Sequence, residues 1–205
     1  MKTLSIKLLG LALFTFVLIG CNTDSSVITP ESETDLLKSG QQDFNSADAV
    51  LYSTSPEEIA GLIHMRIEEK LARDVYDALW KKWNAKVFLN IKLSEQAHTE
   101  AVKRMLNKYS IPDPIVTDVA GVFPDPAFQA LYDQLVLQGS ATIEEAYKVG
   151  VAIEELDIKD LEEQLTIVVD SPDIIRLYTN LKAGSVSHLA AFNRNVIGCV
   201  ALAVD

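Results

Sequence analysis

The sequence predicts an all-α fold: a four-helix bundle with a long crossover between the second and third helices, which contains a short extra helix. Apolar residues recur at helical spacing along four long segments, whereas the alternation typical of strands is weak throughout. Stretches rich in Pro, Gly and Asp separate these segments. The 205 residues, 48% of them hydrophobic, suffice for one such domain and an N-terminal extension. An open array of helices without a buried site is the alternative.

Local signals place the ends of the expected helices. The first helix is expected from Ser55 to about Trp83, because Ser-Pro-Glu-Glu supplies an N-cap, a proline at the first position and acids in the first turn. Pro112 and Pro114 interrupt the chain at the start of the crossover. Further helices are expected over 91–109, 127–137, 140–168 and 171–195.

The N-terminus has the features of a bacterial lipoprotein signal. Lys2 and Lys7 accompany an apolar run that is too short to span a bilayer comfortably. The run ends in LIGC, which resembles a lipobox with Cys21 as the lipidated residue. The expected segments are a signal peptide (1–20), a lipidated Cys with a flexible tether (21–54) and the helical domain (55–205). An ordinary signal peptide or anchor with an incidental cysteine is the alternative.

Lipidation of Cys21 has consequences for location and partners. Two acyl chains would anchor the protein to a membrane without spanning it. We therefore expect a place in the bacterial cell envelope, facing the periplasm or the exterior. Cys199 would be left alone, which excludes an intrachain disulfide. The net charge of −11 argues against a nucleic-acid partner, because binding nucleic acid requires a basic face.

Each long helix is expected to carry ionisable groups on its apolar face. At about 100° per residue, the inward groups are Glu69, Glu95, His98, Glu154, Asp157 and His188. A buried unpaired charge is costly, and a shared cation would offset that cost. Carboxylates and imidazoles are ligands for iron, manganese and zinc. Two alternatives stay open: a hydrogen-bonded polar core, and pairing of Glu69 with Arg66 or Arg73. His64 falls outside this face and is expected at the surface or between helices.

The chain resembles an uncharacterised family of ferritin-like domains in bacteria and archaea in four phrases: EEKLARDVY, SEQAHTEAV, IEELDIKDL and GSVSHLAAF. The interval from Glu69 to Tyr76 and the Glu-x-x-His of Glu95 and His98 are also similar to the first half-site of rubrerythrin-like di-iron proteins. The resemblance covers about 55–195. It implies a ferritin-like four-helix bundle with a metal site in its core.

The resemblance also implies a role for each inward group. Glu69 would be a terminal ligand, Glu95 a bridging ligand, and His98 would complete the ligands of the first metal. Glu154 would serve the second metal, Asp157 would be an additional carboxylate, and His188 matches the histidine of the fourth helix.

The chain departs from that pattern at Ser185, where a di-iron site would supply a second bridging Glu. Without this second Glu, the remaining ligands could hold one ion well, or two ions asymmetrically with the help of Asp157. Tyr76 and Tyr147 lie on the ligand-bearing faces, where a phenol can hydrogen-bond a ligand carboxylate. Core packing is the better single explanation for either tyrosine. Ser185, Tyr76 and Tyr147 are therefore expected around the ligands.

The expected function is metal binding in the helical core, with iron favoured over manganese and zinc. Redox chemistry on dioxygen or peroxide would follow from such a centre. A lipoprotein binding or structural module with a metal-free polar core is the alternative. A homodimer suits a tethered protein better than a storage cage, and the sequence identifies neither an electron donor nor a substrate.

Overall fold

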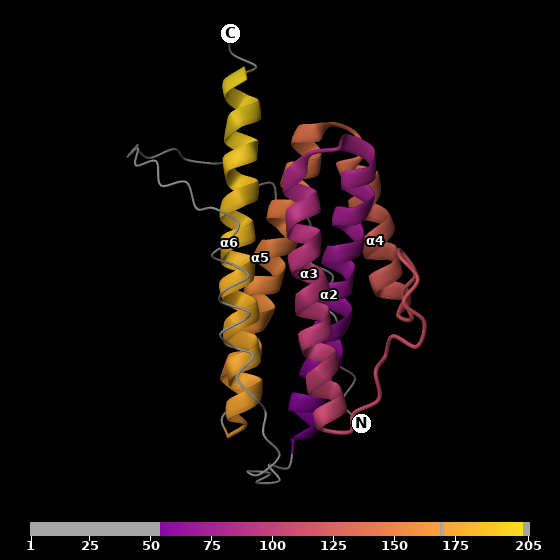
Figure 1. The fold of residues 1–205 in the computed structure, drawn as a ribbon, viewed down its shortest axis with the longest axis vertical. Coiled ribbons are helices and arrows are strands. Elements are labelled where there is room, and N and C mark those ends of the chain that lie inside the picture. Colours follow the sequence, from indigo (N-terminus) through magenta and orange to yellow (C-terminus); the bar gives the residue numbers. More distant parts are fainter. Residues whose placement is uncertain (1–53, 169, 203–205) are drawn as a thin grey trace, which may run out of the picture. The chain divides into compact units, whose positions relative to one another are not determined.

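The computed structural model describes residues 54–168 and 170–202, with the backbone alone for 200–202. In these residues the chain forms five α-helices and no strands (Figure 1). The helices are α2 (Pro56–Trp83), α3 (Lys86–Lys108), α4 (Pro126–Gly139), α5 (Ile143–Ile167) and α6 (Pro172–Leu202). The all-α prediction is confirmed. The expected signal peptide, Cys21 and all but the last residue of the tether lie outside the described residues.

The start of α2 agrees with the sequence signal. The Ser55 hydroxyl accepts a hydrogen bond from the Glu58 backbone N–H at 3.1 Å, and the Glu58 carboxylate accepts one from the Ser55 N–H at 2.7 Å. This reciprocal capping box satisfies two amides that the helix itself leaves without partners. The helix ends at Asn84, whose backbone is left-handed with φ 51°.

The start of α3 differs from the prediction. The helix begins at Lys86 rather than near Ile91, although Ala85 offers no side-chain cap. Phe88 explains the difference, because its fully buried ring stacks on Tyr147 and contacts the rings of Tyr76 and Phe192. Burying an aromatic side chain outweighs a weak local helix signal.

Two other ends also differ. Ser140 ends α4 instead of starting α5, and Thr142 caps α5 by accepting a hydrogen bond from the Glu145 N–H at 3.1 Å. The last helix, α6, continues to Leu202 rather than ending near Asn195.

Two apolar clusters fill the interior. The first apolar cluster includes Tyr76 and Phe88, and the second apolar cluster includes Leu106 and Tyr178. Along the chain, α2 and α6 pass from the second cluster to the first, whereas α3 and α5 pass from the first to the second. Helix α2 packs on α3, and α5 on α6; contacts of α2 with α5 and of α3 with α6 join the two pairs (Figure 1).

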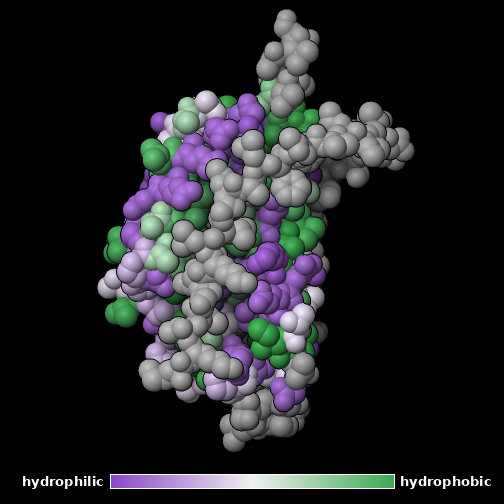
Figure 2. All heavy atoms as spheres, turned by 180° about the vertical axis from the view of Figure 1, so that it is seen from behind, coloured by the Kyte–Doolittle hydropathy of each residue, from purple (hydrophilic) through white to green (hydrophobic). Residues whose placement is uncertain are grey.

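The short helix α4 packs against α2 and α5. The Trp83 indole N–H donates a 2.8 Å hydrogen bond to the carbonyl of Gly139, which ties the end of α2 to the end of α4. Hydrophilic and hydrophobic side chains are interspersed on the face in Figure 2 where described residues are visible. Within the described residues, no helix combines the length and hydropathy that crossing a membrane requires.

Candidate metal centre

A layer of buried polar side chains separates the two apolar clusters. On α3, α5 and α6 these residues lie between a segment that belongs to one cluster and a segment that belongs to the other, and on α2 Glu69 lies near the change from one cluster to the other. The layer contains Glu69 of α2, Glu95 and His98 of α3, Glu154 and Asp157 of α5, and Ser185 and His188 of α6. All the inward groups predicted from the sequence are thus buried in one layer.

The first group of potential ligands joins α2 and α3. The Nδ1 atom of His98 lies 2.8 Å from one oxygen of Glu95 and 3.3 Å from an oxygen of Glu69. Glu95 and His98 can meet in this way because residues three apart lie on the same face of a helix. These three side chains can converge on one ion.

The second group joins α3, α5 and α6. The Nδ1 atom of His188 lies 2.8 Å from the other oxygen of Glu95 and 3.6 Å from an oxygen of Glu154. Glu95, Glu154 and His188 can likewise converge on one ion. Glu95 therefore faces both groups, with one oxygen toward each imidazole, and the two rings lie with their centroids 5.5 Å apart.

The imidazoles are close to these carboxylates without being hydrogen-bonded to them. The Nδ1 atoms of His98 and His188 are buried and have no hydrogen-bond partner, and the same holds for Glu69 Oε1. Ligand atoms about 2.1 Å from a shared ion lie about 3.0 to 3.4 Å from one another. The observed separations of 2.8 to 3.6 Å are close to that range. The donor set and its spacing fit a transition-metal ion in each group.

The basic side chains near Glu69 point elsewhere. Arg66 pairs with Asp113 at 3.1 Å, and Arg73 pairs with Asp118. Among the described residues, no Lys or Arg forms an ion pair with a carboxylate of the centre. Pairing of Glu69 with an arginine, which the sequence left open, does not occur.

The charges of the centre perturb one another. Burial raises the pKa of Glu69 to about 8, and burial also raises the pKa values of Glu154 and Asp157. Burial alone would lower the pKa of His188, but the neighbouring Glu95 and Glu154 raise it to about 10. Four carboxylates face two imidazoles, so protonated imidazoles cannot balance all the negative charge. The centre must take up protons or bind a cation.

Asp157 lies in the layer but outside both ligand groups. Its Oδ2 atom accepts a hydrogen bond from the hydroxyl of Ser185, while Oδ1 has no partner. The Ser185 hydroxyl also lies 2.9 Å from the carbonyl of Leu181, which is an alternative acceptor for its single proton. The serine therefore contacts a carboxylate of the centre at the position where the resembled pattern has a glutamate.

The two tyrosines behave differently. Tyr76 donates a 2.5 Å hydrogen bond to Glu154, as expected for a residue that orients a ligand. Tyr147 stacks on Phe88 with ring centroids 5.6 Å apart. In the described part of the chain its hydroxyl bonds to no carboxylate of the centre, so Tyr147 is a packing residue.

Gly184 is a residue of the centre that the sequence analysis missed. A Cβ atom at this position would lie 2.6 Å from Cε1 and 2.7 Å from Nε2 of His98. Only a residue without a side chain leaves room for this imidazole. The available signal was a glycine inside a long helix four residues before His188, because glycine is unfavourable there without a packing reason.

Known proteins resemble this chain over most of the helical part. Hypothetical protein MJ0754 from Methanococcus jannaschii has a crystal structure with a TM-score of 0.69 and 49% identity, covering 71% of this chain and 82% of that one. A DUF305 fragment from Deinococcus radiodurans has a TM-score of 0.56 at 14% identity, covering 69% and 96% respectively. The latter likeness shows the fold alone.

Sequence comparison identifies the family. Uncharacterized protein MJ0754 of Methanocaldococcus jannaschii is 51% identical over 140 residues, which are 68% of this chain and 75% of the relative. Residues 58–198 match the family described as an uncharacterized protein domain, DUF2202. The chain therefore belongs to the DUF2202 family.

Proposed function

We propose that this chain is a ferritin-like four-helix bundle protein that binds iron, or a similar transition metal, in its core. The observation that carries the proposal is the pair of ligand groups that share Glu95. Each group places an unpartnered imidazole nitrogen among buried carboxylate oxygens. Imidazole and carboxylate ligands suit iron, manganese and zinc, and the resemblance to rubrerythrin-like proteins favours iron.

The two groups could each hold one ion, with Glu95 serving both. Glu69 and His98 would hold the first ion, and Glu154 and His188 the second, with one Glu95 oxygen for each. Ser185 leaves the pair without a second bridging carboxylate. Each ion would have three protein ligands, so coordination positions would stay open for a small molecule.

The side chains of the centre define what it can do. A bound iron would supply electrons and Lewis acidity for chemistry on dioxygen or peroxide. Tyr76 fixes the orientation of Glu154 by donating its hydroxyl proton across a 2.5 Å oxygen–oxygen separation. The two apolar clusters shield the layer on both sides, which strengthens electrostatic interactions within it.

Metal analysis of the full chain tests this proposal. We expect metal after expression with iron, manganese and zinc, and a fall in melting temperature on chelation. Free metal at a concentration 100 times its Kd raises the free energy of unfolding by about 2.7 kcal/mol. Glu95→Ala with His98→Ala should remove the metal held by the core centre and the part of the melting-temperature change that depends on it. Glu100→Ala with Lys103→Ala, on the same helix but outside the centre, is the matched control. Metal-free protein from supplemented medium would contradict the proposal.

A second candidate is a lipoprotein binding or structural module with a metal-free polar core. The hydrogen bond from Ser185 to Asp157 favours it, because the serine satisfies one carboxylate oxygen without a cation. This candidate predicts a melting temperature that is the same with and without chelator.

The proposed location rests on the N-terminal sequence, in which Cys21 ends a lipobox-like LIGC. Lipid-anchored protein should fractionate with membranes, and Cys21→Ala should release it to the soluble fraction. Membrane association that survives this substitution would contradict lipidation at Cys21. We also propose a homodimer rather than a cage, which size-exclusion chromatography in detergent would distinguish.

A further inference from the structure

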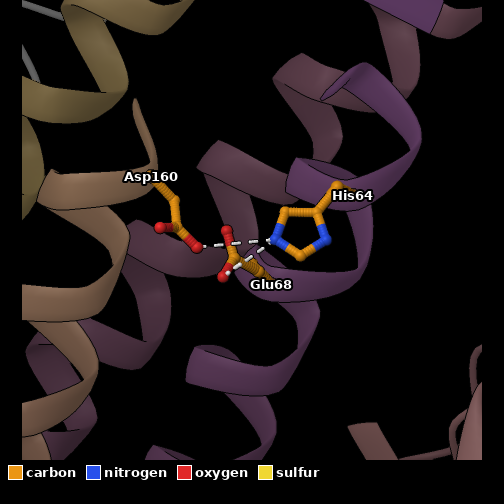
Figure 3. A group of neighbouring side chains, drawn as sticks. All are labelled: His64, Glu68 and Asp160. Atoms are coloured by element: carbon orange, nitrogen blue, oxygen red, sulfur yellow. Dashed lines mark ion pairs between the residues drawn. The ribbon is translucent and has the colours of Figure 1, made fainter. Parts of the chain in front are cut away.

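A second cluster of metal-binding side chains lies between α2 and α5, apart from the core centre. The Nε2 atom of His64 lies 3.3 Å from Oε1 of Glu68 and 3.6 Å from Oδ2 of Asp160 (Figure 3). His64 and Glu68 share one face of α2 because they are four residues apart, and Asp160 approaches from α5. The three ligand atoms lie within 4.8 Å of one another.

Glu68 shows that this cluster is more than a surface ion pair. Its side chain is only 8% exposed, and its Oε2 atom is buried without a hydrogen-bond partner. A buried carboxylate oxygen without a partner is costly. The same ring nitrogen of His64 faces both carboxylates, of Glu68 and of Asp160. A cation among the three side chains would satisfy these atoms together.

Neighbouring residues hold the cluster in place and leave it reachable. The His64 ring packs against Phe128 of α4, with centroids 5.5 Å apart. Asp160 uses its other oxygen, Oδ1, to pair with Lys159 at 3.0 Å, so Oδ2 stays available. The His64 side chain is 40% exposed, so an ion could reach the cluster from solvent.

We propose that His64, Glu68 and Asp160 form a second metal site that binds a divalent transition-metal ion such as Zn²⁺. One imidazole nitrogen and two carboxylate oxygens would be the protein ligands, and water would fill the remaining positions. The imidazole favours zinc, iron or manganese over magnesium and calcium, which prefer oxygen ligands. The site shares no residue with the core centre and does not depend on the function proposed for that centre.

Zn²⁺ titration of the full, chelator-treated chain tests the site. His64→Ala with Asp160→Asn should lower the stoichiometry by about one Zn²⁺ per chain. The same decrease is expected when Glu95 and His98 are also replaced by Ala, because the two sites are separate. Glu155→Gln with Glu162→Gln removes two exposed carboxylates from the same helix and should leave the stoichiometry unchanged. Unchanged zinc binding after His64→Ala with Asp160→Asn would overturn the proposal.

A measurement on the unsubstituted chain keeps the test independent of variant folding. Diethyl pyrocarbonate should modify His64 far more readily than His98 and His188, whose side chains are 2% and 1% exposed. Zn²⁺ should protect His64 several-fold in peptide mass spectrometry, and a tenfold excess of Mg²⁺ should not restore modification. Equal modification with and without Zn²⁺ would show that His64 is only the partner of two acids in an ion pair.

Discussion

Gly184 determines where the imidazole of His98 can lie. The ring occupies the space that any side chain at position 184 would need. A methyl group there would require the imidazole to move, because its contacts with the ring would be 2.6 and 2.7 Å. The glycine on α6 therefore determines the position of the His98 imidazole, which belongs to α3.

We expect Gly184→Ala to impair metal binding while the protein stays helical. Alanine is favoured over glycine in a helix by about 1 kcal/mol, so secondary structure should not suffer. The displaced imidazole should reduce the bound metal, as measured by elemental analysis. Gly198→Ala on the same helix is the control, because a Cβ atom there would meet nothing within 4 Å. Equal metal content in both variants would show that His98 is not a ligand.

Helical periodicity sufficed to predict which residues turn inward. Glu69, Glu95 and His188 are all buried in the layer, as the apolar stripes indicated. Periodicity within one helix cannot reveal contacts between helices. The closeness of Gly184 to His98 and of His64 to Asp160 depends on how α2, α3, α5 and α6 pack, and no single-helix pattern contains it.

At the scale of elements, three basic residues of α2 hold the link between α3 and α4. Arg66 pairs with Asp113, and Arg73 pairs with Asp118. Lys70 is fully buried, pairs with Asp74 and donates to the Val119 carbonyl at 2.9 Å. The link therefore lies against α2 along three successive turns of basic side chains.

The attachment of Asp118 should depend on pH. Hydrogen bonds from Arg73 lower its pKa to about 2, against about 3.9 in an unfolded chain. Its contribution to the free energy of unfolding should be complete above about pH 4 and vanish as the pH falls through about 2. Because the side chain is 40% exposed, we expect Asp118→Asn to cost about 1 kcal/mol or less at pH 6.

Chemical denaturation of both proteins from pH 6 to pH 2 checks this expectation. The two unfolding free energies should converge at the acid end. Asp133→Asn, which alters an exposed carboxylate of α4, is the matched control. If the difference in unfolding free energy between Asp118→Asn and the unsubstituted chain grew toward low pH, it would contradict the lowered pKa of Asp118.

The ends of the helices were harder to predict from the sequence than the helices themselves. The capping box at Ser55 is a local signal, so the start of α2 could be read from the sequence. The start of α3 could not, because the burial of Phe88 against other helices extends it. No local sequence signal indicated that α6 continues beyond Asn195.

For the whole molecule, the centre links two helix pairs. Packing is most extensive between α2 and α3 and between α5 and α6, whereas the candidate ligands come from all four helices. A bound metal would therefore add connections between the pairs. The sequence could predict this division of ligands among helices because each long helix carries its own inward groups.

We expect metal to slow amide hydrogen exchange in all four ligand-bearing helices. Ligand binding stabilises the closed state and so suppresses the openings that permit exchange. Exchange in α4, which supplies no ligand to the core centre, should change least and serves as the internal control. Mass spectrometry of chelated and metal-loaded protein makes the comparison. Protection confined to α2 and α3 would indicate an ion held by one pair alone.

The position of Glu95 between the two imidazoles also affects how two metal ions would bind to the core centre. One carboxylate would donate to two ions, which in two-metal sites lie about 3.5 to 4 Å apart and repel each other. Without a second bridging carboxylate at Ser185, Glu95 would be the one carboxylate shared by both ions. The first ion should bind more tightly than the second. The protein would then show negative cooperativity, and a singly loaded form would accumulate when metal is scarce.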